Sequence, residues 1–85
     1  MKLRWSVAKN AELKRIRGVS FEEILEAEWV GAAAHPVHPN QRLHFFLLDG
    51  YIWVALDVME DDAVFLKTLF PSRRHTKLWK RGTLS

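Results

Sequence analysis

The chain has 85 residues, of which 48% are hydrophobic and four are tryptophan, and its formal net charge is +3. A chain of this length forms one domain, residues 1–85, whose core is modest because it buries only about 60–65% of the unfolded surface, which argues against a deep cofactor cleft. The absence of cysteine excludes disulfides, thiolate metal sites and cysteine nucleophiles. The sequence has neither a signal-peptide pattern nor an apolar stretch near the about 18 residues of a membrane span. We therefore expect a cytoplasmic protein that does not contact a membrane.

The charged residues are segregated along the chain. Residues 1–18 carry six cations and one acid, and residues 63–85 carry six cations and no acid. The acidic residues are concentrated in segments 19–30 and 49–62. If the two basic ends meet in the fold, they form a positive surface suited to a polyanion. The alternative is that these cations lie on solvated helix faces, and charge alone favours neither interpretation.

Two helices are predicted at the start of the chain. Residues 6–18 begin with a serine that can act as N-cap and end with a glycine that can stop a helix after Arg17. In the next segment, Ser20 and Glu23 have the spacing of a capping box, with apolar residues at the two positions of a hydrophobic staple. We expect this second helix to run from Phe21 to Trp29 and to end at Gly31.

The middle of the chain predicts strands. Residues 32–41, AAAHPVHPNQ, combine helix-favouring alanines with two prolines, and we expect a short edge strand followed by a loop. Residues 42–59, RLHFFLLDGYIWVALDVM, predict a hairpin with Asp49 and Gly50 as a type I′ turn between strands rich in aromatic and branched residues.

The hairpin register assigns side chains to two faces of the sheet. One face, called the mixed face below, carries four cross-strand pairs: Leu48 with Tyr51, Phe46 with Trp53, His44 with Ala55, and Arg42 with Asp57. The other, called the apolar face below, carries Leu43, Phe45, Leu47, Ile52, Val54, Leu56 and Val58. We expect the first two helices to cover the apolar face, and Arg42 to form a structural ion pair with Asp57.

A third long strand, VFLKTLF, is predicted after a turn at EDDA. A three-residue turn places Lys67 on the mixed face, where it can bridge to Asp57, and we favour this register because an unpaired lysine is costly to bury in a core. Pro71 ends the strand and Ser72 caps a short helix over residues 73–81, near the mixed face. The predicted fold is α+β, with two N-terminal helices packed on a three- or four-stranded antiparallel sheet and a short C-terminal helix.

The first turn of the last predicted helix carries Arg73, Arg74 and His75. Cations are disfavoured at a helix N-terminus because the free N–H groups already give it partial positive charge. A bound phosphate would compensate, since guanidinium groups and helix N-terminal amides both bind phosphate. The acidic residues of segment 57–62, or an acidic partner, would compensate equally well.

Two stretches resemble the BrnT family of bacterial toxins. Residues 3–25, LRWSVAKNAELKRIRGVSFEEIL, are similar to the family's opening in Trp5, in the Lys9-Asn10 pair and in the GVSFEE segment. Residues 66–77, LKTLFPSRRHTK, resemble the family's closing strand and basic segment, with matches at Arg73, Arg74, Thr76 and Lys77. The chain departs from the family pattern at Pro71, where a serine is usual, and in the HPVHPNQRLHFF segment.

The resemblance implies a RelE-like ribonuclease fold and RNA cleavage that arrests growth. It also implies a cognate antitoxin that neutralises the toxin and joins it in repressing their operon, so that operator DNA is contacted only through the antitoxin complex. RNA cleavage without a metal or other cofactor needs a base, an acid and cations around the phosphorane. The catalytic candidates are Lys67, Arg73, Arg74 and His75, and the RNA-binding candidates are Lys77, Lys80, Arg81 and Arg42. A non-catalytic basic binding module, either a nucleic-acid binder or a degenerate toxin, explains the charge pattern as well.

Two other groups of residues receive a structural interpretation. The spacing of His35, His38 and His44 invites a metal site, but proline follows two of them and no carboxylate or cysteine partner is near, so we expect no metal. The aromatic side chains of the mixed face can stack RNA bases, although a place in the core is the stronger interpretation. We assign Trp5 and Trp29 to packing.

Overall fold

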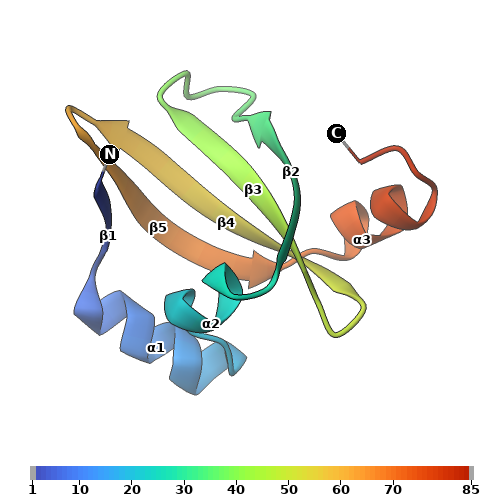
Figure 1. Cartoon of the computed structure of the whole chain (residues 1–85), viewed down its shortest axis with the longest axis horizontal. Coiled ribbons are helices and arrows are strands. Elements are labelled where there is room, and N and C mark those ends of the chain that lie inside the picture. Colours follow the sequence, from blue (N-terminus) through green and yellow to red (C-terminus); the bar gives the residue numbers. More distant parts are fainter. Residues whose placement is uncertain (1, 85) are drawn as a thin grey trace.

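The protein, described here by a computed structural model for residues 2–84, is a five-stranded sheet with three helices (Figure 1). The elements in chain order are β1 (Lys2–Trp5), α1 (Val7–Arg17), α2 (Phe21–Leu25), β2 (Glu28–Ala34), β3 (Gln41–Leu48), β4 (Tyr51–Glu60), β5 (Ala63–Pro71) and α3 (Arg73–Lys80). The strand order is β1-β5-β4-β3-β2. Strand β1 runs parallel to β5, and the other neighbouring strands are antiparallel.

The prediction of an α+β class is confirmed, but the predicted architecture was wrong. The sheet has five strands and is mixed, and the chain begins with strand β1, so that α1 and α2 lie between strands. Strand β1 has no recognisable sequence pattern, because its four residues are too few to show a period of two. This strand exists through its parallel pairing with β5, in which Leu3 lies beside Val64.

The second predicted helix is right in its first half and wrong in its second half. Its capping box is present, since Ser20 Oγ accepts from the backbone N–H of Glu23 and the Glu23 carboxylate accepts from the N–H of Ser20. The helix ends at Leu25, however, and residues 28–34 form the edge strand β2 paired with β3. Pairing with Leu47 and Phe46 of β3 makes Glu28 and Trp29 part of this strand, where helix was predicted. The edge strand predicted at the alanines is confirmed for residues 32–34.

The central hairpin has the predicted register. Asp49 and Gly50 have φ values of 51° and 76°, as a type I′ turn requires. All four predicted cross-strand pairs are present, from Leu48 with Tyr51 to Arg42 with Asp57. The division into a mixed and an apolar face is therefore correct for β3 and β4.

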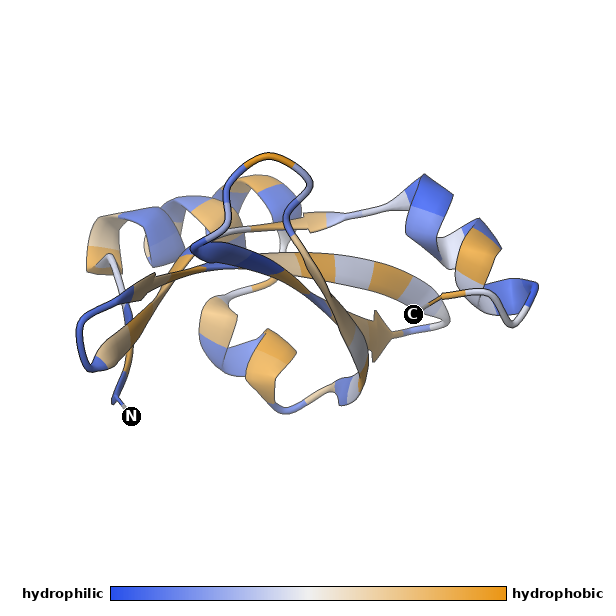
Figure 2. Ribbon diagram, turned by 90° about the horizontal axis from the view of Figure 1, so that it is seen from above, coloured by the Kyte–Doolittle hydropathy of each residue, from blue (hydrophilic) through white to orange (hydrophobic). Residues whose placement is uncertain are grey.

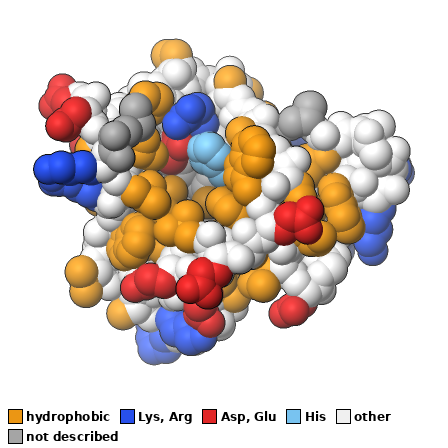
Figure 3. Space-filling model, in the orientation of Figure 1, with side chains coloured by type: hydrophobic (Ala, Val, Ile, Leu, Met, Phe, Trp, Pro, Cys, Tyr) orange, Lys and Arg blue, Asp and Glu red, His pale blue; other side chains and the backbone are white. Residues whose placement is uncertain are grey.

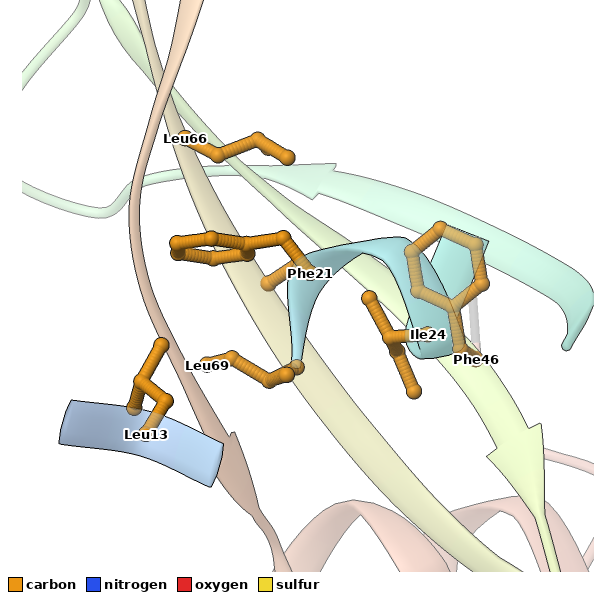
Figure 4. Packing of buried hydrophobic residues seen from close by; sticks show 7 residues of the cluster. Leu13, Phe21, Ile24, Phe46, Leu66 and Leu69 are labelled. Atoms are coloured by element: carbon orange, nitrogen blue, oxygen red, sulfur yellow. The ribbon is translucent and has the colours of Figure 1, made fainter. Parts of the chain in front are cut away.

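The helices cover the two faces in the opposite way to the prediction. Helices α1 and α2 contribute to the core on the mixed face (Figure 4), which consists of Leu13, Phe21, Ile24, Phe46, Ala55, Leu66 and Leu69. Helix α3 packs on the apolar face, where Trp79 lies against the cluster of Phe45, Ile52 and Val54. Figure 2 shows α2 and α3 on opposite sides of the sheet. The mixed face can hold a core because its half nearest the hairpin turn is apolar and only its other half carries Arg42, His44 and Asp57.

Lys67 does not lie where the sequence placed it. The turn between β4 and β5 has two residues, Asp61 and Asp62, since Glu60 pairs with Ala63. A bulge then leaves Lys67 without a partner on β4. Its ammonium lies 5.2 Å from the ring centroid of Phe65. The register predicted for Lys67 is wrong, and the alternative of an ion pair with Asp57 is not present within residues 2–84.

Asn10 joins α1 to the start of α2. Its Oδ1 accepts from the backbone N–H of Phe21 at 2.7 Å, and its Nδ2 donates to the carboxylate of Glu22 at 2.5 Å. The N–H of Phe21 is one of the free donors at a helix N-terminus, and the Phe21 side chain is fully buried. Asn10 therefore fixes the start of α2, so that the apolar side chains of this helix pack in the core.

We predict that Asn10→Ala lowers the free energy of unfolding by about 1–2 kcal/mol, because it leaves a helix N-terminal donor without its acceptor. Urea denaturation followed by circular dichroism measures this change. The matched control is Asn40→Ala in the exposed loop before β3, which should change stability by less than about 0.5 kcal/mol. Equal effects of the two substitutions would contradict the role given to Asn10.

Candidate functional site

Hydrogen bonds to the backbone of Ile52 join helix α3 and its N-cap to β4. The N–H of Ile52 donates to Thr76 Oγ1 at 2.9 Å, and the carbonyl of Ile52 accepts from the N–H of Ser72 at 2.9 Å. Ser72 also caps the helix, as predicted, with its Oγ accepting from the N–H of His75. These bonds hold the first turn of α3 at a fixed position beside the end of the sheet.

The outward side of α3 is a basic surface, which we define as Arg73, Arg74, Lys77, Lys80 and Arg81. All five side chains are exposed. Four of them line a shallow depression around Leu78, and the first turn of the helix is strongly hydrophilic (Figure 2). Within residues 2–84, no ion pair joins any of these five cations to an acid. No ion pair with segment 57–62 therefore compensates these charges in the described part of the chain, and a phosphate, an acidic partner and a solvated helix face remain as interpretations.

His75 lies at the inner edge of this basic surface. Its ring packs against Phe45, with the ring centroids 4.8 Å apart, and its Nδ1 lies 2.6 Å from Ser72 Oγ. Burial, and secondarily the charge of Arg74, lower the pKa of His75 below its ordinary value. The imidazole is consequently neutral at pH 7, which is the state that a general base requires.

A second polar cluster lies on the mixed face, on the other side of the sheet. The Asp57 carboxylate is only 1% exposed and lies 3.2 Å from Arg42 Nη2 and 2.6 Å from His44 Nε2. The other ring nitrogen of His44, Nδ1, accepts from the indole N–H of Trp29 at 3.2 Å. Arg42 and His44 supply the partners that a buried carboxylate needs, and the predicted pair of Arg42 with Asp57 is confirmed.

This second cluster borders a hollow of about 260 Å³. The hollow opens on the side of the molecule seen in Figure 3, where a histidine side chain lies among apolar ones. Its apolar lining comes from β1, α2 and the three central strands: Leu3, Leu25, Phe46, Ala55, Val64 and Leu66. Its polar lining is Lys2, Arg42, His44 and Asp57.

The structure separates the residues that the sequence grouped into one site. Arg73, Arg74, Lys77, Lys80 and Arg81 are together on α3, with His75 beside them. Arg42, predicted to bind RNA, lies at the hollow on the opposite face of the sheet. No hydrogen bond or ion pair within residues 2–84 joins Lys67 to α3.

The cluster around His44 was missed as a site, although the hairpin register contained its signal. That register placed His44 on the mixed face, one residue pair away from Asp57, and a histidine close to a carboxylate on one face is a recognisable pattern. Trp29 was assigned to packing, yet its side chain is 57% exposed. Its role in this cluster depends on β2, where the sequence pattern had indicated a helix at this residue.

Neither family models nor curated proteins nor solved structures match this chain. Of the helices in the described part, none is long and apolar enough to cross a membrane. Residues 2–84 also contain no group of three or more histidine, aspartate or glutamate side chains arranged to hold a metal ion. The function is therefore inferred from the geometry of the two sites.

We predict that Arg74→Ala raises the pKa of His75 part of the way to its ordinary value, because it removes one of the two causes of the shift and leaves burial in place. A titration of the His75 ring protons by NMR measures the pKa. Arg73→Ala is the matched control, since that side chain is not a cause of the shift. An unchanged pKa in Arg74→Ala, or an equal rise in both variants, would contradict the geometry.

Proposed function

We propose that this chain is the toxin of a type II toxin–antitoxin system, a ribonuclease that needs no metal and binds RNA through the basic surface of α3. The observation that carries the proposal is the group of five exposed cations on one helix with no acid paired to them in the described part of the chain. Such a group matches a polyanion, because phosphate contacts by lysine and arginine supply most of the affinity for nucleic acid. The proposed reaction, RNA cleavage, is inferred from the resemblance of residues 3–25 and 66–77 to BrnT toxins.

In this proposal Arg73 and Arg74 bind the scissile phosphate and stabilise the charge that develops on it. His75 is the acid–base residue, held against Phe45 and beside Ser72. Its lowered pKa leaves it neutral near pH 7, so that it can accept the proton of a 2′-hydroxyl. Lys77, Lys80 and Arg81 extend the phosphate contacts along the helix. Lys67 is left out of this proposal, because its ammonium lies over Phe65 and no hydrogen bond or ion pair within residues 2–84 joins it to α3.

The proposed partners follow from this function. A cognate antitoxin neutralises the toxin, and operator DNA is bound only through the complex of the two. We place the pair in the cytoplasm, where its RNA substrate is found. In this proposal the antitoxin is the acidic partner that compensates the charge of α3, and it competes with RNA for the basic surface.

A non-catalytic binding module is the second candidate, and a specific observation favours it. The hydrogen bonds and ring contacts of α3 supply one candidate acid–base residue, His75, whereas cleavage needs both a base and an acid. In this alternative the basic surface binds RNA or an acidic partner without chemistry. The two candidates differ in whether RNA is broken.

We predict that inducing this chain alone in a bacterial host stops growth and degrades cellular RNA, whereas Arg73→Ala/Arg74→Ala does neither. The purified double variant should bind short single-stranded RNA at least about tenfold more weakly, with the salt dependence of log K reduced by about two. Growth curves, RNA integrity and fluorescence anisotropy measure these effects.

The control for charge is Lys9→Ala/Arg15→Ala, which removes two cations of α1 and should leave growth arrest and RNA affinity unchanged. Normal growth and intact RNA with folded wild-type protein present would contradict the ribonuclease and favour the binding module. Equal RNA affinity of the wild type and the α3 double variant would contradict both candidates in their RNA-binding form.

A further inference from the structure

The hollow on the mixed face combines an apolar wall with four polar side chains, those of Lys2, Arg42, His44 and Asp57. Six of its lining residues are apolar and belong to five different elements, so that the wall is built by the fold as a whole. Its volume of about 260 Å³ lies just below the range of about 300–1,000 Å³ typical of small-molecule sites. A compound with a single ring and a short chain is therefore the size of ligand that fits.

The side-chain groups of the hollow that can still form hydrogen bonds with a ligand are donors. Both oxygens of Asp57 already accept, from Arg42 and from His44 Nε2. The second nitrogen of His44 accepts from Trp29. The remaining groups are the N–H groups of Arg42 that do not face Asp57, on a side chain that is 43% exposed, and the ammonium of Lys2. Within residues 2–84 no acid pairs with Lys2.

These donors are cationic, and within residues 2–84 Asp57 is the one acid that forms an ion pair with either of them. Lys2 and Arg42 carry two positive charges and Asp57 carries one negative charge, so that the lining residues present an excess of one positive charge. A ligand with one anionic, accepting group would satisfy the free donors, and a charge-assisted hydrogen bond to guanidinium is stronger than a neutral one. A neutral ligand of the same shape can accept a hydrogen bond but brings no charge to these two cations, and a cationic ligand would be repelled by them.

We propose that this hollow is a binding site for a small apolar monocarboxylic acid, preferably an aromatic one. The carboxylate lies against Arg42 and Lys2, and the apolar body lies between Leu3 and Leu25 on the rim and Phe46 and Leu66 on the floor. Exposed Leu3 and Leu25, 46% and 38% accessible, become covered when the ligand binds. The site is on the opposite face of the sheet from α3, and the inference does not rest on RNA binding.

The test is a titration of the ¹⁵N-labelled full chain with 4-phenylbutanoate, followed by amide chemical shifts. We expect a dissociation constant below about 1 mM, given the number of ligand atoms that the hollow can cover. The largest shifts should be at residues 2, 3, 42, 44 and 64. The alcohol with the same apolar body, 4-phenylbutan-1-ol, should bind at least about tenfold more weakly, because it lacks the charge that Arg42 and Lys2 receive.

Variants separate the parts of the site. Lys2→Gln should weaken the acid by about threefold to tenfold and leave the alcohol unchanged. Leu25→Glu should abolish binding of the acid, whereas Ile16→Glu on α1, which replaces another exposed apolar residue outside the hollow, should not. Arg73→Ala/Arg74→Ala should also leave binding unchanged. Equal affinity for the acid and the alcohol, shifts confined to α3, or no binding up to about 10 mM would overturn the proposal.

Discussion

The two-residue turn at Asp49 and Gly50 is the constraint on which the rest of the structure depends. A type I′ turn has positive φ at both of its residues, and its geometry fixes the pairing of β3 with β4 residue by residue. A shift of this pairing by one residue would place Asp57 of β4 on the opposite face from Arg42 and His44 of β3, so that the cluster could not form. The core on each side, the buried carboxylate and the separation of the two sites all follow from this register.

The small size of the domain explains why a hollow remains on one face. Helix α2 has only five residues and ends at Leu25, after which the chain turns into the edge strand β2. It covers the apolar half of the mixed face, through Phe21 and Ile24, and stops beside the half that carries Asp57. Neither α1 nor α3 extends over the hollow that remains. Its polar groups are tolerated there because Asp57 is fully paired while Arg42 stays partly in solvent.

Local patterns predicted the elements whose signals are local. The helix caps at Ser6, Ser20 and Ser72 and the hairpin turn were right, because each depends on residues a few positions apart. What failed depends on contacts between distant segments, which no local pattern encodes. Strand β1 forms through its pairing with β5. Residues 28 and 29 are in β2 and not in a helix because β3 pairs with them. The bulge that moves Lys67 out of its predicted register arises in the pairing of β4 with β5. Of the candidate site, the basic group on α3 could be predicted from sequence, whereas the hollow required the tertiary structure.

The central claim is that a polyanion binds on the α3 side of the sheet and not at the hollow. The most direct measurement is a map of amide chemical shifts in the ¹⁵N-labelled chain on addition of a short single-stranded RNA at low salt. The account predicts that the largest changes lie in residues 72–81, with those of Arg42 and His44 unaffected. Changes concentrated at Arg42, His44 and the rest of the hollow would contradict it, because the sheet separates that face from the basic surface.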